Sequence, residues 1–163
     1  MIQRVQTIYL FLAAVLMSLT LFMPLATMTQ GDVEVVLKAF SISGLDNIVQ
    51  STQLPLYLGI LLVLPTLLPL VTIFLFKKRM LQIRLCVSQI VLQVGALAFI
   101  GIYCYRLWDS WSAYMTEIGV KPAIVFDLGL ASLTPAISIV FVVLAIRGIA
   151  KDEALVRSLD RIR

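Results

Sequence analysis

One carboxylate lies within the fourth long apolar stretch of this chain, and it is the first candidate for chemistry. Asp127 follows Ala123, where that stretch begins, by four residues. A charge at the bilayer centre costs about 3 kcal/mol on insertion scales, so a carboxylate found there usually has a function, such as binding or transferring protons or cations. Asp127 lies near the outer end of the stretch, however, where it could cap a helix or pair with Lys121 or Arg106. This structural role is the favoured interpretation, and proton or cation coupling is the alternative.

Three glutamines in the third apolar stretch form the second candidate. Gln82, Gln89 and Gln93 follow one another at intervals that place them on one face of a helix. In lipid, carboxamides turn toward neighbouring helices and hydrogen-bond to them. The row is therefore predicted to join helices. The alternative is a polar lining for a solute path, formed by Gln89 and Gln93 together with Asp127.

The residues of the common catalytic centres are missing or badly spaced. Cys86 and Cys104 lie about 27 Å apart if their stretch is one helix, too far for a disulfide, so both are predicted to be small buried side chains. The chain has no histidine, which removes the commonest metal ligand and the usual general base. The sequence predicts a protein that is not an enzyme and needs no cofactor.

Basic residues gather between the second and third apolar stretches. Lys77, Lys78 and Arg79 follow one another there. They fix the orientation of the helices, and each contributes about 1 kcal/mol of attraction to an anionic membrane surface. These three residues are candidates for contact with lipid headgroups or with a partner.

The last segment, residues 147–163, carries an apolar stripe and a charged face at helical spacing. Leu155 and Leu159 belong to the stripe, and Arg157 and Arg161 to the charged face. The pattern predicts an amphipathic helix. It could lie in the membrane interface, which is the favoured interpretation, dock a protein partner, or fold beneath its own bundle.

The elements that position these residues follow from composition. With 163 residues, 61% hydrophobic and only 13% charged, and a mean hydropathy of +1.02, the chain is too apolar for a soluble domain. Stretches of about 20 apolar residues suffice to cross the membrane. The sequence predicts an all-α membrane protein, a four-transmembrane-helix bundle that is a single integral membrane domain over residues 1–163. The expected spans are residues 5–27, 54–76, 85–105 and 123–146.

Two spans have further features. Pro65 and Pro69 interrupt the second span in mid-membrane and predict a kink, with neighbouring helices satisfying the freed carbonyls. The third helix is expected to continue outward, because Tyr103, Leu107, Trp111 and Tyr114 keep a helical spacing. Trp108 and Trp111 are expected to be anchors at headgroup depth.

The placement of charge predicts the orientation. Of the 13 lysines and arginines, all but Lys38, Arg106 and Lys121 fall on one side of the predicted spans. The positive-inside rule then places both termini in the cytoplasm, which explains the net charge of +4 without a nucleic-acid partner. On the outer side, period-two alternation at residues 32–35 and 40–43 predicts a short β-ribbon that rests on the helix ends or on the second outer loop.

Three segments carry a resemblance that extends along the whole chain. They are the start Met1–Leu10, the loop Phe76–Cys86 and the ending Asp152–Arg163. Together they resemble a bacterial family of small four-span inner-membrane proteins catalogued as a domain of unknown function. The resemblance implies a multi-pass protein of the bacterial inner (cytoplasmic) membrane, and it implies no activity.

Two functions fit these observations. The favoured hypothesis is a non-catalytic accessory or scaffolding subunit, which acts in the lipid bilayer by association with other membrane or cytosolic proteins or with copies of itself. The alternative is a small oligomeric transporter or permeation component.

Overall fold

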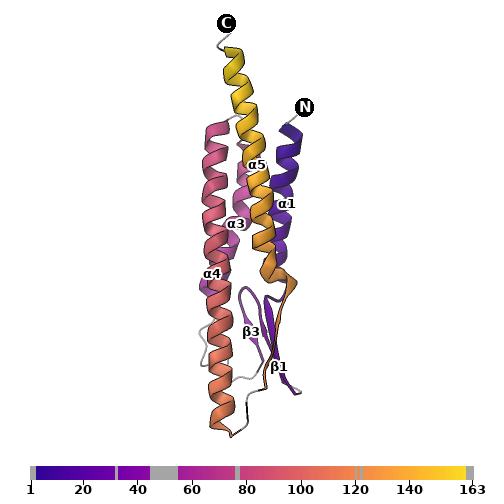
Figure 1. Ribbon diagram of the computed structural model, residues 1–163, viewed down its shortest axis with the longest axis vertical. Helices are drawn as coiled ribbons and strands as arrows, with labels where there is room; N and C mark the ends of the chain where they lie inside the picture. Colours follow the sequence, from indigo (N-terminus) through magenta and orange to yellow (C-terminus); the bar gives the residue numbers. More distant parts are fainter. Residues whose placement is uncertain are drawn as a thin grey trace.

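Four helices run along the molecule, and each is long and apolar enough to cross a membrane (Figure 1). The computed structural model describes residues 3–31, 33–44, 55–75, 78–119, 121 and 123–160, and the side chains of all of them except residues 3, 4, 157, 159 and 160. The helices are α1 (Gln3–Phe22), α3 (Leu56–Phe74), α4 (Arg79–Glu117) and α5 (Leu130–Asp160). The predicted four-helix bundle is thereby confirmed.

The helices form a ring in which each packs against two others. Both α1 and α4 pack against α3 and α5. Helix α1 begins, α4 begins and α5 ends at the same end of the bundle, which is called the basic end below (Figure 1). The opposite end carries a small antiparallel sheet and is called the sheet end. Its strands are β1 (Ala26–Gln30), β2 (Val33–Leu37), β3 (Ile42–Ser43) and β4 (Val125–Leu128), in the order β3-β2-β1-β4.

Two of the four helices are much longer than a membrane requires. Helices α1 and α3, with 20 and 19 residues, match a hydrocarbon core of about 30 Å. Helix α4 has 39 residues and measures about 58 Å, and α5 has 31 residues and measures about 46 Å. In Figure 1, α4 extends past the bundle at the sheet end and α5 extends past it at the basic end. The predicted continuation of the third helix past residue 105 is confirmed.

The first and fourth apolar stretches are not helical over their whole length. Span 5–27 was expected to be one helix, but α1 ends at Phe22 and β1 begins at Ala26, since Pro24 ends the helix. Span 123–146 was expected to begin seven residues before the observed start of α5 at Leu130, because residues 125–128 form β4 instead. Residues 147–160 are helical, as the tail pattern predicts, and they continue α5 without a break.

The sheet confirms and enlarges the predicted β-ribbon. Strands β2 and β3 pair as the alternation predicts, and β1 and β4 add a third and fourth strand, with Ala26 opposite Leu37 on one side and Leu128 on the other. One face of the sheet is buried against the outer part of α4, around Trp111. Trp111 is fully buried, so its expected role as a headgroup anchor is wrong.

A glycine fixes the junction between the sheet and α5. The Gly129 amide donates a hydrogen bond to the Leu25 carbonyl oxygen at 3.0 Å. A Cβ atom at Gly129 would overlap the carbonyl oxygen of Pro24, and backbone atoms give way less readily than side-chain ends. Only glycine therefore allows β4 and α5 to meet beside the turn between α1 and β1.

Two apolar clusters fill the interior. The larger joins the sheet to α3, α4 and the start of α5, and the smaller joins α1, α4 and α5 nearer the basic end. Cys104 belongs to the first and Cys86 to the second, and both are buried and free, as predicted. Pro65 and Pro69 lie inside α3 and are buried. Between the clusters lie the polar side chains of Gln89, Gln93 and Ser138, fully buried in the middle of the bundle.

Candidate functional site

The glutamine row joins helices at two of its three positions. Gln82 Nε2 donates to the Thr72 carbonyl oxygen of α3 at 2.9 Å. Gln93 Nε2 donates to Ser138 Oγ of α5 at 2.7 Å, and Ser138 in turn donates to the Ala13 carbonyl oxygen of α1 at 3.3 Å. These bonds confirm the predicted role between helices, because together they reach from α4 to all three other helices. Gln89 forms no such bond within the described part of the chain.

Asp127 lies outside the helices altogether. It is the third residue of β4, opposite Thr27 of β1, and its side chain is exposed. The prediction placed Asp127 inside the fourth apolar stretch because hydropathy does not separate Val125–Leu128 from the helix that follows. The structure does not bring Asp127 together with Gln89 and Gln93, which lie along α4 in the bundle interior.

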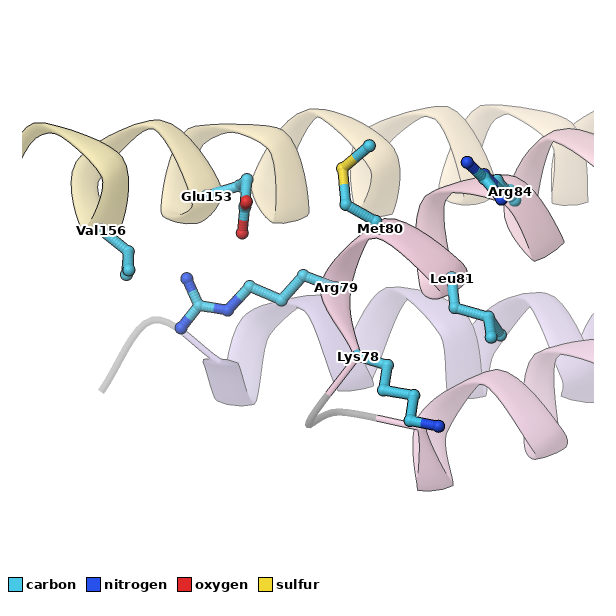
Figure 2. Close-up of a pocket in the computed structure, with 7 residues that line it drawn as sticks. All are labelled: Lys78, Arg79, Met80, Leu81, Arg84, Glu153 and Val156. Atoms are coloured by element: carbon cyan, nitrogen blue, oxygen red, sulfur yellow. The ribbon is translucent and has the colours of Figure 1, made fainter. Parts of the chain in front are cut away.

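The basic end carries an open groove between the start of α4 and the end of α5. It has a volume of about 580 Å³. Its lining consists of three cations, one carboxylate and three apolar side chains: Lys78, Arg79, Arg84, Glu153, Met80, Leu81 and Val156. In Figure 2 the Arg79 side chain extends toward Glu153 and Val156, whereas Lys78 points away from them. The groove therefore combines positive charge with apolar walls.

Asp152 fixes the end of α5 above this groove. Its carboxylate accepts a hydrogen bond from Gln6 Nε2 of α1 at 2.5 Å. Its backbone carbonyl accepts one from the Arg79 guanidinium of α4 at 2.9 Å. Asp152 and Gln6 are both buried, and Gly148 lies beside the Gln6 side chain. This polar clamp, consisting of Gln6, Arg79 and Asp152, ties three helices together where α5 leaves the bundle.

The sequence identified two residues of the groove, Lys78 and Arg79, and Arg79 also belongs to the clamp. It did not reveal the contact between Gln6 and Asp152. Two spacings could have revealed it. Asp152 follows the buried Ile149 by three residues, and Gln6 precedes the buried Leu10 by four, so each lies on the core-facing side of its helix. Neither was singled out, because Gln6 lies within the predicted first span and Asp152 belongs to the charged face of the predicted tail.

Beyond the clamp, α5 presents apolar side chains that belong to neither apolar cluster. Leu155 is 48% exposed and Val156 is 40% exposed. Among the other predicted contact residues, Lys77 and Arg161 lie outside the described residues, and so do the side chains of Arg157 and Leu159. Of the predicted contact residues whose side chains the structure describes, Lys78 and Arg79 line the groove, and Leu155 directly precedes the lining residue Val156 in α5.

Comparison with known proteins gives a family without an assigned role. No curated protein matches the chain. A family model does match, and it covers residues 2–162, which is nearly the whole chain. The predicted resemblance to a family of unknown function is thereby confirmed: the chain belongs to the family described as Domain of unknown function (DUF4293).

Proposed function

We propose that this protein is a non-catalytic membrane protein that acts by association, as an accessory or scaffolding subunit that docks a protein partner at its basic end. The observation that carries the proposal is the continuation of α5 beyond the bundle as a single helix with exposed Leu155 and Val156. A helix that presents exposed apolar side chains at the end of the bundle offers a surface on which an apolar partner segment can pack.

The polar clamp supports this proposal because it holds the docking element in place before a partner arrives. Hydrogen bonds from Gln6 and Arg79 meet at Asp152, one turn before Leu155. A helix that is already ordered and oriented loses less conformational freedom on binding. The clamp therefore favours association through the helix that it holds.

The charge around the groove indicates the chemistry of the partner. Lys78, Arg79 and Arg84 line a groove that also includes the exposed Val156. A partner segment with an apolar face flanked by carboxylates would complement both the charge and the apolar walls. The excess of basic residues at this end further supports an orientation with both termini in the cytoplasm, so the proposed partner is a cytosolic protein or the cytosolic part of a membrane protein.

The test is purification of the tagged protein from its native membrane in mild detergent, with mass spectrometry of the proteins that accompany it. The discriminating variant is Leu155→Asp, and Ser158→Asp is the matched control because Ser158 is exposed on the same helix. We expect a stoichiometric partner to accompany the wild type and the control and to be lost from Leu155→Asp, with unchanged thermal unfolding in all three.

Two outcomes would contradict the proposal. Retention of the same partner by Leu155→Asp would show that the exposed face of α5 is not the docking element. Purification of the wild type alone, or only with copies of itself, would exclude an accessory role under these conditions and favour permeation.

A further inference from the structure

Gln89 is the most unusual polar side chain in the described part of the molecule. It is fully buried, and neither its Nε2 nor its Oε1 atom has a hydrogen-bond partner among the described residues. One turn away, Gln93 is also fully buried, and its Oε1 atom likewise has no partner there. Three polar atoms of two neighbouring side chains thus lie in the bundle interior without the bonds that burial ordinarily demands.

The hydrogen bonds between helices establish what lies at the depth of Gln89. Helices α3 and α4 are antiparallel, and Gln82 of α4 meets Thr72 of α3. Gln89 lies seven residues after Gln82 in α4, and Pro65 lies seven residues before Thr72 in α3. Seven residues span about 10 Å along a helix, so Gln89 and Pro65 lie at the same depth in the bundle. By the same reasoning, the Gln93–Ser138 bond places Val142 of α5 at this depth.

Helix α3 contains two prolines near this depth. Pro65 and Pro69 lack the amide hydrogens that would otherwise bond to the carbonyl oxygens of Leu61 and Pro65, four residues before each. Both prolines are buried. The carbonyl oxygens freed by the two prolines therefore belong to the same layer of the bundle as the Gln89 carboxamide.

A group that pairs with the carboxamide atoms of Gln89 and Gln93 and with the freed carbonyl oxygens must both donate and accept hydrogen bonds. An unsatisfied amide in an apolar medium costs several kcal/mol, and in mid-membrane no bulk water compensates for it. A cation would satisfy the oxygen atoms but would leave the Nε2 donors of Gln89 unpaired. Water donates and accepts, and buried water commonly forms about three hydrogen bonds to groups of this kind.

We infer that ordered water binds in the middle of the bundle, held by Gln89 and Gln93 of α4 and by the carbonyl oxygens that Pro65 and Pro69 free in α3. Helices α3 and α4 are then joined through water at this layer, in contrast to the direct bond between Gln82 and Thr72 nearer the basic end. This inference is independent of the docking function proposed above, because it concerns the interior of the bundle and not its basic end.

The experiment is water-edited solid-state NMR of the full-length, ¹⁵N-labelled protein in lipid bilayers. It measures how fast magnetisation passes from water protons to the side-chain Nε2 of Gln89. The control is the backbone amide of Ala96, which is buried and lies on the same helix. We expect transfer to Gln89 to be severalfold faster than transfer to Ala96. Equal rates would overturn the inference.

A second experiment uses a variant to test whether Gln89 holds the water. Gln89→Met keeps the length of the side chain and removes both amide atoms, and thermal unfolding in detergent checks that it folds. We expect this change to slow water transfer to the Gln93 Nε2 severalfold, because the shared water is no longer held. Unchanged transfer to Gln93 in a folded Gln89→Met protein would show that Gln89 does not hold the water.

Discussion

The two ends of this bundle each carry one helix that extends beyond the membrane-sized core, but they hold that helix by different means. At the sheet end, the outer part of α4 is covered by a sheet and buries Leu107, Trp111 and Met115. At the basic end, α5 extends with Leu155 and Val156 exposed, and hydrogen bonds to Asp152 fix its base. The apolar side chains of the first end are covered by the chain itself, whereas those at the second end stay exposed.

The comparison teaches that burial and hydrogen bonding are used for different purposes here. Apolar burial stabilises in proportion to the area removed from water, so the sheet end is held by many side chains at once. Hydrogen bonds contribute less in net terms, about 0.5–1.5 kcal/mol each, but they specify direction. The clamp thus sets where α5 points without covering the side chains beyond it.

The largest effect is expected at the sheet end. Trp111→Ala removes the largest fully buried side chain and leaves a cavity between α4 and the sheet, so the free energy of unfolding should fall by about 3–5 kcal/mol. Equilibrium unfolding in mixed detergent measures this loss. The matched control is Trp108→Ala, since Trp108 is 45% exposed and should lose less than about 1 kcal/mol. Equal losses would mean that the sheet does not cover α4.

A smaller and more local effect is expected at the basic end. Asp152→Ala removes the carboxylate acceptor and leaves the buried Gln6 amide without its partner, at a cost of about 1–3 kcal/mol. The loss should appear as roughly 5- to 150-fold faster hydrogen exchange at the last turns of α5, with protection of the sheet unchanged. Lys151→Ala, at an exposed neighbouring position, should leave exchange as it is. Faster exchange throughout the bundle would show that the clamp stabilises the whole fold.

The smallest effect is expected at Asp127. Because its side chain is exposed on β4, Asp127→Ala should change the free energy of unfolding by less than about 0.5 kcal/mol. Equilibrium unfolding under the conditions used for the tryptophan variants measures the change. A loss comparable to that of Asp152→Ala would restore Asp127 as a structural residue and weaken the distinction between the two ends.

The helices could be predicted because each membrane-spanning helix corresponds to one continuous apolar stretch of sequence. Residues 56–74 carry no charged side chain and few polar ones, and α3 occupies them. The strands β1 and β4 could not be predicted in this way, because residues 26, 27 and 125–128 lie inside the two stretches that hydropathy assigned to helices. Their conformation depends on pairing between Ala26 and Leu128, which lie far apart in the chain.

The candidate site could likewise be predicted only where its residues lie close together in the sequence. The basic residues of the groove were visible as a local cluster, and the exposed Leu155 was visible in the stripe of the tail. The contact between Gln6 and Asp152 joins the two ends of the chain and depends on how α1 and α5 cross. Nothing local to either residue reveals its partner, although the helical spacing of Gln6 and Leu10 indicates that Gln6 faces the core.

The unbroken course of α4 has a mechanical consequence. This helix runs from the sheet to the groove without an interruption between Arg79 and Glu117, and it contains no proline at which it could bend. One rigid element therefore spans both ends of the molecule. A rigid tilt of α4 by about 5° around one end would displace the other end, about 58 Å away, by about 5 Å, so the sheet and the groove cannot be repositioned independently where each packs on this helix.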